Sequence, residues 1–349
     1  MKSLLKHYKT MSEGKEELLF LGDVVPHKPV RFNNKHRVVI NLECPIVIDE
    51  SPPAQGKINL SVSNNYLTDI FESNLEIVCL ANNHIFDFGI KGLDSTISQL
   101  ERNRIKWFGI ERNASKRLTP FVYETNDIKI ALIAAICSST SPISGLDNIA
   151  FVNLLNVDLI AANVKELKTI ADRVVLYLHW GEEESSYPKE KDIRIARRLI
   201  EAGVDIIVGS HAHAPQAIEK YKEGIIAYNL GNFLMPPLKN IPSYFENNGS
   251  PRAYFNKLLM PWNRVSWGLL VDIRTLNFKI KKYIYLFNRI IEVPITPFDK
   301  YINLKEITTN IKYDKARKAH LMRREKFSKI MHFIVNPYIP QRIKKKLWN

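Results

Sequence analysis

Short apolar runs rich in β-branched residues recur along this chain and alternate with segments of helical spacing. Buried strands are expected at 17–22, 37–42, 76–81, 128–137, 173–179 and 204–209. Helices are expected at 66–73, 92–102, 154–170 and 189–202, and Gly203 suits the end of the last one. With 349 residues, 45% of them hydrophobic, the chain can bury a substantial core. The alternation predicts an α/β fold with a largely parallel sheet covered by helices.

The second half of the chain has a different character. From about residue 224 to residue 288 the pattern is more β-like, and from about residue 302 it becomes helical and basic. The stretch 235–264 is rich in proline, asparagine and aromatic residues, so we expect a long loop there that forms a lid or a substrate wall.

Five of the expected strands run directly into side chains that can bind metals or move protons. These side chains are Asp23, Glu43, Asn83, His84, His179, His211 and His213. In open α/β sheets, ligands bind at the carboxyl ends of the strands. Neighbouring strands lie about 4.8 Å apart, so five such ends can surround one small volume.

The chemistry of this set suits a metal centre. Carboxylate, imidazole and amide groups together favour a divalent ion such as Mn²⁺, Fe²⁺ or Zn²⁺. Each residue alone has a simpler interpretation, since an aspartate after a strand usually caps a turn and a lone histidine is usually structural. The recurrence at five strand ends favours the metal site.

The motifs that carry these residues also resemble a known family. GDVVP, NLECPI, ANNHIFDFG, LHWGEE, GSHAHAPQAIE and YNLGNF occur in that order. They resemble the CapA, or poly-γ-glutamate capsule biosynthesis, family of the calcineurin-like metallophosphoesterase superfamily. The resemblance covers about residues 17–290 and implies a four-layer α/β/β/α sandwich with the metal site at one edge of paired sheets. We therefore expect an N-terminal extension (1–16), a metallophosphoesterase-like domain (17–300) and a basic helical tail (301–349).

The resemblance also implies roles for the individual residues. Asp23 and His213 would bind a first metal ion, and Glu43 would bridge it to a second. Asn83, His179 and His211 would bind that second ion. His84 would protonate the leaving oxygen, and Asp87, three residues on, would orient its ring. Ordinary members of the superfamily carry a histidine where this chain has Val25, so the first ion would have one imidazole fewer.

These roles predict a metal-dependent, phosphoesterase-like hydrolase that acts in the biosynthesis of a bacterial capsule or surface polymer, with one or two divalent ions. The substrate would be an anionic polymer or a phosphoester. A non-catalytic accessory subunit, which binds an anionic polymer or docks on a membrane-bound polymer synthase, is the alternative. Nucleic acid is an unlikely partner, because no recognised nucleic-acid module is present.

Charge and cysteine content bear on location. The formal charge is +14. Much of it lies beyond residue 314, where the chain has eleven Lys or Arg residues and one acidic residue. Phe327, Ile330, Met331 and Ile334 share one face of an expected helix, followed by Pro337, Pro340 and the basic end RIKKKLWN. This tail suits an anionic membrane face or a synthase, although its apolar face can instead pack on the domain. Widely spaced cysteines and an N-terminus without an apolar stretch favour a cytoplasmic protein. The basic tail would make it peripheral at the inner membrane face.

Overall fold

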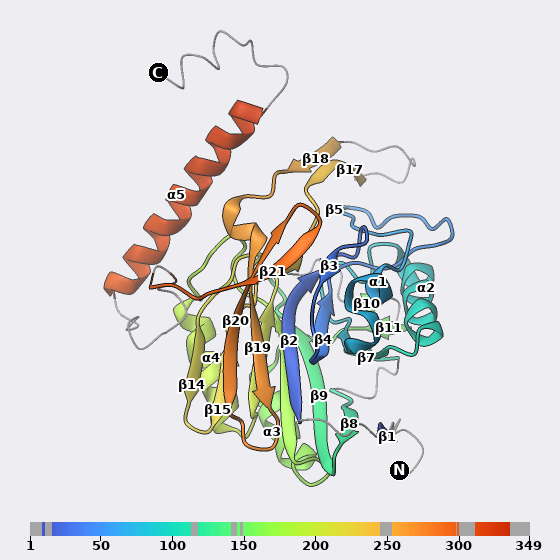
Figure 1. The fold of residues 1–349 in the computed structure, drawn as a ribbon, viewed down its shortest axis with the longest axis vertical. Coiled ribbons are helices and arrows are strands. Elements are labelled where there is room, and N and C mark those ends of the chain that lie inside the picture. Colours follow the sequence, from blue (N-terminus) through green and yellow to red (C-terminus); the bar gives the residue numbers. More distant parts are fainter. Residues whose placement is uncertain are drawn as a thin grey trace.

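Two large β-sheets form the body of the protein. The computed structural model describes residues 9–10, 16–112, 118–140, 145–146, 149–244, 253–297, 299 and 311–335. One sheet has seven strands in the order β1-β8-β9-β12-β13-β15-β14. The other has nine, in the order β3-β21-β20-β19-β2-β4-β6-β7, with β16 paired to β2 (Figure 1).

The seven-stranded sheet is parallel at its centre. Its strands are β1 (Lys9–Thr10), β8 (Phe121–Thr125), β9 (Ile128–Ile136), β12 (Arg173–His179), β13 (Ile206–Ser210), β14 (Ile218–Tyr221) and β15 (Gly224–Ala227). Strands β9, β12, β13 and β15 run parallel, while β8 and β14 pair antiparallel on either side of them. The carboxyl ends of β12 and β13 therefore lie side by side.

The nine-stranded sheet is mixed. Its strands are β2 (Glu17–Val24), β3 (Arg31–Phe32), β4 (Arg37–Leu42), β6 (Leu75–Cys79), β7 (Lys106–Phe108), β16 (Asn232–Leu234), β19 (Val265–Asp272), β20 (Phe278–Leu286) and β21 (Arg289–Val293). Strands β2, β4, β6 and β7 are parallel, and β19, β20 and β21 extend the sheet antiparallel. Thus β2, β4 and β6 present their carboxyl ends together.

Alternating side chains of the central strands build two cores. In β12, Val175 and Tyr177 enter the core between the sheets, whereas Val174, Leu176 and Leu178 enter the core on the outer face. Because successive side chains in a strand point to opposite faces, a strand buried on both faces reads as a continuous apolar run. This is why the first-half strands were predictable from sequence.

Helices cover the outer faces of both sheets. Helices α1 (Leu67–Phe71) and α2 (Gly89–Arg102) contact β6 and β7, with the 3₁₀ turn η1 (Glu72–Asn74) after α1. Helices α3 (Val157–Leu167) and α4 (Glu190–Glu201) cover the other sheet, where α4 contacts β13 and β15. The side chain of Asn156 caps α3, and Gly203 follows α4 with a φ of +112°. The four-layer α/β/β/α sandwich is confirmed.

The expected strands and helices are present with ends shifted by a few residues, but two expectations need correction. The residue pattern alone predicted one largely parallel sheet, whereas the strands divide between two sheets. The stretch expected to be a long loop holds β17 (Leu238–Tyr244), β18 (Ala253–Lys257) and the 3₁₀ turn η2 (Pro261–Arg264). Strands β17 and β18 pair with each other and with β5 (Lys57–Ile58), forming a small three-stranded sheet. A second small pair joins β10 (Gly145–Leu146) and β11 (Ala150–Phe151).

Helix α5 (Ile311–Val335) lies against the domain along part of its length (Figure 1). The hydroxyl of Tyr313 donates to the carbonyl of Pro188 at 2.5 Å, and the ring of Phe327 lies 5.8 Å from that of Trp262. Ile330 is 44% exposed. Of the helices described, none is both long enough and apolar enough to cross a membrane. Most of the expected N-terminal extension, the start of the tail, Pro337, Pro340 and the basic end lie outside the described residues, as does the side chain of Ile334.

Candidate metal centre

The predicted metal ligands come from the carboxyl ends of strands in both large sheets. Asp23 lies near the end of β2, Glu43 follows β4, and Asn83 lies in the turn after β6. His179 ends β12, and His211 and His213 follow β13. The site therefore sits between the two sheets at one edge of the sandwich. Pairing two sheets allows ligands to approach from opposite sides, which a single sheet edge does not.

A buried amide connects the two carboxylates. The Nδ2 group of Asn41, the last-but-one residue of β4, donates to Asp23 Oδ1 at 2.8 Å and to Glu43 Oε2 at 2.5 Å. Its own Oδ1 accepts from Asn82 Nδ2 at 3.2 Å. Both carboxylates have no exposed surface. Asn41 thus fixes two buried acids whose ionised forms would otherwise have few partners.

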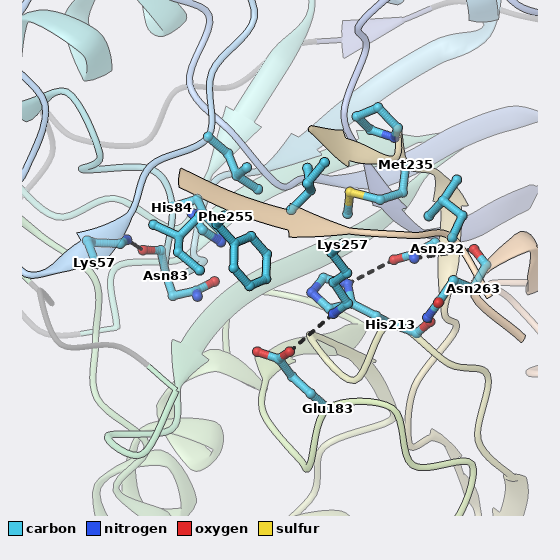
Figure 2. A pocket seen from close by; sticks show the side chains of 15 residues that line it. Lys57, Asn83, His84, Glu183, His213, Asn232, Met235, Phe255, Lys257 and Asn263 are labelled. Carbon is cyan, nitrogen blue, oxygen red and sulfur yellow. Dashed lines mark hydrogen bonds and ion pairs between the residues drawn. The ribbon is translucent and has the colours of Figure 1, made fainter. Parts of the chain in front are cut away.

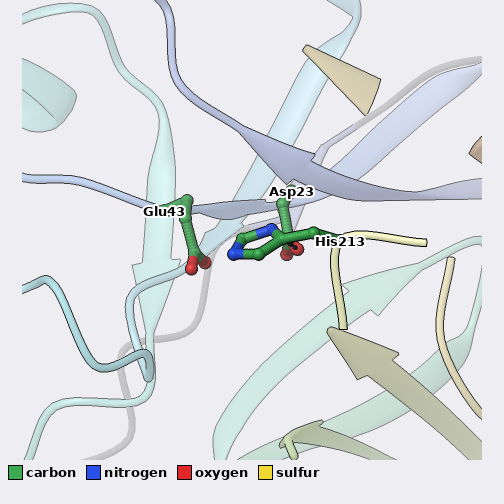
Figure 3. A group of neighbouring side chains, drawn as sticks. All are labelled: Asp23, Glu43 and His213. Atoms are coloured by element: carbon green, nitrogen blue, oxygen red, sulfur yellow. Dashed lines mark ion pairs between the residues drawn. The ribbon is translucent and has the colours of Figure 1, made fainter. Parts of the chain in front are cut away.

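His213 completes a three-residue cluster with these acids. Asp23, Glu43 and His213 each offer one ligand atom, and these atoms lie within 4.8 Å of one another (Figure 3). The Nδ1 atom of His213 lies 2.9 Å from Asn232 Oδ1 and 3.5 Å from Asp23 Oδ2. A proton on Nδ1 donated to Asn232 leaves Nε2 with a lone pair for a cation.

His179 and Asn83 meet on the other side of Glu43. The Nε2 atom of His179 lies 2.8 Å from Asn83 Oδ1 and 3.6 Å from Glu43 Oε1. Its Nδ1 lies 2.9 Å from the hydroxyl of Ser210, which can accept that proton and leave Nε2 unprotonated. The rings of His179 and His211 lie 4.8 Å apart. The structure therefore brings all six predicted ligands into one region.

The turn that carries the two later histidines is conformationally strained. His211 has a φ of +91° and His213 a φ of +54°, both in the left-handed region that residues with a Cβ avoid. The backbone N–H of His211 donates to Asp23 Oδ2 at 3.2 Å. Each such residue costs on the order of 1–3 kcal/mol, and such strain is often found at functional sites.

The end of β2 packs closely against the backbone of Gly231, and this contact fixes its position. A Cβ on Gly22 would lie 1.9 Å from the carbonyl oxygen of Gly231, so only glycine fits beside Asp23. The N–H of Asp23 donates to that same carbonyl at 3.0 Å. The residues before β16 therefore hold Asp23 in place.

Burial disfavours charge on three of the predicted ligands, whereas, despite burial, Asp23 and Glu183 raise the pKa of His213. Burial, followed by the nearby charge of Asp23, raises the pKa of Glu43 well above its ordinary value. Burial, followed by His213, lowers the pKa of His211 to about 4, and burial also lowers the pKa of His179. A bound cation would favour the ionised form of Glu43 and would accept the lone pairs of the neutral His179 and His211 rings.

The hydrogen bonding of two predicted ligand atoms also indicates a cation site. Seven buried side-chain atoms among the described residues have no hydrogen-bond partner, and two of them, Glu43 Oε1 and His211 Nδ1, belong to predicted ligands. Buried polar atoms without partners are rare in native proteins and call for a specific reason. A divalent ion would provide that reason for both atoms. The residues present therefore fit a metal ion.

The ring of His84 lies beside this cluster and is held in place by Asp87. Its Nδ1 lies 2.6 Å from Oδ2 of Asp87, which is fully buried and also accepts from the N–H of Leu60 at 2.6 Å. Lys57 forms an ion pair with the other oxygen of Asp87 and donates to the carbonyl of Asn83. Asp87 therefore occupies the orienting position predicted for it.

A cavity of about 210 Å³ opens above these residues. His84, His213, Asn83 and Glu183 line it on the polar side (Figure 2). Burial alone would raise the pKa of Glu183, but His213, Lys257 and His211 together lower it to about 2. A small substrate can therefore reach both His84 and the metal cluster from one pocket.

Sequence reasoning assigned no role to four polar residues at this site. Asn41, Glu183 and Asn232 lie within the quoted motifs NLECPI, LHWGEE and YNLGNF, which therefore carried a signal for them. Lys57 had no such signal, because it lies in a polar stretch where the structure forms a strand of only two residues.

Comparison with known proteins identifies the family of this chain. Residues 17–237 match the model of the family described as bacterial capsule synthesis protein PGA_cap. The capsule biosynthesis protein CapA of Bacillus anthracis is 30% identical over 227 residues, 60% of this chain and 53% of that protein. The PGA biosynthesis protein CapA of Bacillus subtilis is 28% identical over 205 residues, 58% of this chain and 54% of that protein. The chain thus spans about half the length of these relatives.

A solved structure is also similar at low level. The 5′-nucleotidase precursor of Thermus thermophilus is 16% identical, with a TM-score of 0.40, over 92% of this chain and 60% of that one. A likeness this weak supports no statement about activity. The family match rests instead on the stretch that carries every predicted ligand, from Asp23 to His213. The chain therefore belongs to the bacterial capsule synthesis protein family, PGA_cap.

Proposed function

We propose that this protein is a metal-dependent, phosphoesterase-like hydrolase that acts in the assembly of a poly-γ-glutamate-like capsule or another surface polymer. The family match supports the capsule context. The site supports the hydrolase activity, because one pocket is lined both by His213 of the buried metal cluster and by His84. The ring of His84 is fixed by its hydrogen bond to Asp87.

Six residues would hold one or two divalent ions. Asp23, Glu43 and His213 form the first group, while Asn83, His179 and His211 surround the other face of Glu43. A bound ion would supply Lewis acidity and a nucleophile at neutral pH. Val25 is buried near the first group and offers no ligand, so we expect the first ion to be held more weakly.

His84 would act as the general acid. The hydrogen bond from its Nδ1 to Asp87 fixes the ring and leaves Nε2 to face the substrate. A proton on Nε2 can then pass to the leaving oxygen as the ester bond breaks. Lys57 and the N–H of Leu60 keep the Asp87 carboxylate in place.

The single observation that carries this proposal is the pair of orphaned ligand atoms. Glu43 Oε1 and His211 Nδ1 are buried without hydrogen-bond partners, next to a pocket lined by His84. A purely structural role would leave both atoms unsatisfied at a cost of about 1–3 kcal/mol each.

A substrate screen tests the proposal. Protein loaded with Mn²⁺, Fe²⁺ or Zn²⁺ is assayed with bis-p-nitrophenyl phosphate and with a γ-glutamyl p-nitroanilide. We expect metal-dependent turnover of the phosphodiester that is lost on chelation and regained when metal is restored. Turnover of the γ-glutamyl compound alone would make the enzyme an amidase. Metal binding without turnover of either compound would favour the accessory, polymer-binding role.

We further propose that the protein acts in the cytoplasm at the inner membrane face. The support is the concentration of positive charge beyond residue 314, which suits an anionic surface. A membrane-bound polymer synthase is the corresponding protein partner.

A further inference from the structure

The pocket above the metal cluster has two chemically different sides. His84, Asn83, His213 and Glu183 form the polar side. The opposite side consists of apolar side chains: Ile58, Leu60, Met235, Leu238, Phe255 and Leu259. In Figure 2, Met235 and Phe255 lie above His213 and Glu183. A ligand that fills this space must present a polar group to one side and an apolar body to the other.

Part of the apolar side comes from the small three-stranded sheet. Ile58 belongs to β5, Leu238 to β17 and Phe255 to β18, and these strands pair with one another. This small sheet, here called the cover sheet, thus contributes three of the six apolar side chains. Phe255 is only half-buried, so its ring keeps surface for a ligand to contact.

The two lysines of the pocket already face carboxylates. Lys57 pairs with Asp87, and Lys257 pairs with Glu184 at 2.8 Å and with Glu183 at 3.4 Å. A polyanion needs positive groups to match its repeated charges. The lining residues instead supply balanced pairs, so the positive charge for an anionic group would come from the metal cluster alone.

We propose that this pocket binds an alkyl phosphoester, with its single phosphoryl group at the metal cluster and its hydrocarbon chain against the cover sheet. This inference rests on the proposed phosphoesterase function and names its substrate class. Phe255, Leu238 and Leu259 determine specificity through contact with the chain, and His84 contacts the phosphoryl end. A γ-linked glutamate chain, with a carboxylate on every residue, does not match the apolar side.

Binding measurements with non-hydrolysable probes test the inference without requiring turnover. Mn²⁺-loaded protein is titrated by calorimetry with methyl-, ethyl-, butyl- and hexylphosphonate, and with a γ-linked glutamate oligomer. Burying one methylene contributes enough to tighten binding by about fourfold, so we expect affinity to rise by up to that factor per methylene. Affinity independent of chain length, no binding of any phosphonate, or tighter binding of the glutamate oligomer than of hexylphosphonate would overturn the inference.

Two substitutions locate the effect. Phe255→Ala should reduce the gain per methylene to less than about twofold, because part of the chain loses its apolar contact. Phe287→Ala is the matched control, since Phe287 is 94% exposed at the turn between β20 and β21. This variant should show the same gain in affinity per methylene as the wild type. If Phe255→Ala does not fold, Leu259→Ala removes apolar contact on the same side of the pocket. It should also reduce the gain in affinity per methylene. An unchanged series in the folded variant would contradict the assignment.

The same probes separate this inference from the proposed function. Chain-length-dependent binding without hydrolysis of alkyl p-nitrophenyl phosphates would retain the ligand class and remove the hydrolase activity. Hydrolysis with a KM independent of alkyl length would retain the hydrolase and overturn the ligand class.

Discussion

The Nδ1 atom of His84 lies 2.6 Å from Oδ2 of Asp87, a carboxylate with no exposed surface. Aspartate at this distance fixes the orientation and tautomer of the ring, so that Nε2 faces the pocket. In the proposed assignment the pair lies beside the metal ligands and binds no ion itself. Substitutions at His84 and Asp87 should therefore affect catalysis without affecting metal binding.

Replacing His84 should remove activity and keep the metal. We expect His84→Ala to lower kcat by about 10²–10⁴-fold, the usual effect of losing a general acid. Metal content, measured by mass spectrometry, should match that of the wild type. Asp87→Asn should lower kcat less, because the ring stays in place with a weaker partner. Loss of metal together with activity would instead make His84 a ligand.

Lys57 should contribute more to stability than its place in a two-residue strand suggests. It is 7% exposed and pairs with the fully buried Asp87, so Lys57→Met leaves a buried charge without its partner. Breaking a buried pair in this way costs about 3–5 kcal/mol. Urea denaturation should show this loss, and a smaller loss in the double variant Lys57→Met/Asp87→Asn. Equal losses in the two proteins would show that the ion pair is not the cause.

Removing helix α5 should loosen the loop that carries Glu183. Arg324 donates to the carbonyl of Glu184 at 2.6 Å and to the hydroxyl of Ser186 at 2.7 Å, and its guanidinium stacks 4.5 Å from the ring centre of Trp262. Truncation after Thr309 should leave a folded domain that is less stable by about 1–3 kcal/mol. Arg324→Gln should reproduce part of the loss, whereas the exposed Lys326→Gln should not.

The same truncation tests the proposed membrane location. If the tail docks on an anionic membrane, the truncated protein should lose salt-sensitive binding to vesicles that contain phosphatidylserine. Vesicle binding that survives truncation would place the membrane contact elsewhere in the protein.

Docking of α5 should weaken in acid because of His320. Burial, followed by the charges of Arg324 and Arg323, lowers the pKa of His320 to about 4, and its ring lies 4.9 Å from that of Tyr187. The docked state favours the neutral ring, so docking is strongest above the ordinary pKa of 6.5 and is lost as pH falls from 6.5 toward 4. Hydrogen-exchange protection of α5, corrected for intrinsic rates, should fall between pH 7.5 and pH 5. In His320→Gln that fall should be much smaller; an equal fall would assign it to other groups.

Much of this site could be predicted because its ligands follow strands buried on both faces. Strand β12 reads as one apolar run that ends at His179, and β4 ends just before Glu43. The division of the strands between two sheets is not encoded in such runs, since both sheets produce the same pattern. It followed only from the family resemblance.

The cover of the pocket could not be predicted for a different reason. Strands β17 and β18 lie in a stretch rich in proline and asparagine, residues that weaken the strand signal. Strand β5 has two residues, too few for any periodic pattern. The structure forms these strands through pairing between segments almost two hundred residues apart, as in Ser243 with Ile58. Local propensity does not report such pairing.

The most direct test of the account is the metal content of protein purified without added metal. Glu43 Oε1 and His211 Nδ1 are buried without partners, so we expect at least one Mn, Fe or Zn ion per chain. His211→Ala should lower that content sharply. The control His36→Ala should not, because His36 lies just before the start of β4, at the opposite end of that strand from Glu43, with its Nδ1 3.5 Å from Glu17 Oε2. A folded wild-type protein that holds no metal and takes up none on dialysis, or full occupancy in His211→Ala, would contradict the account.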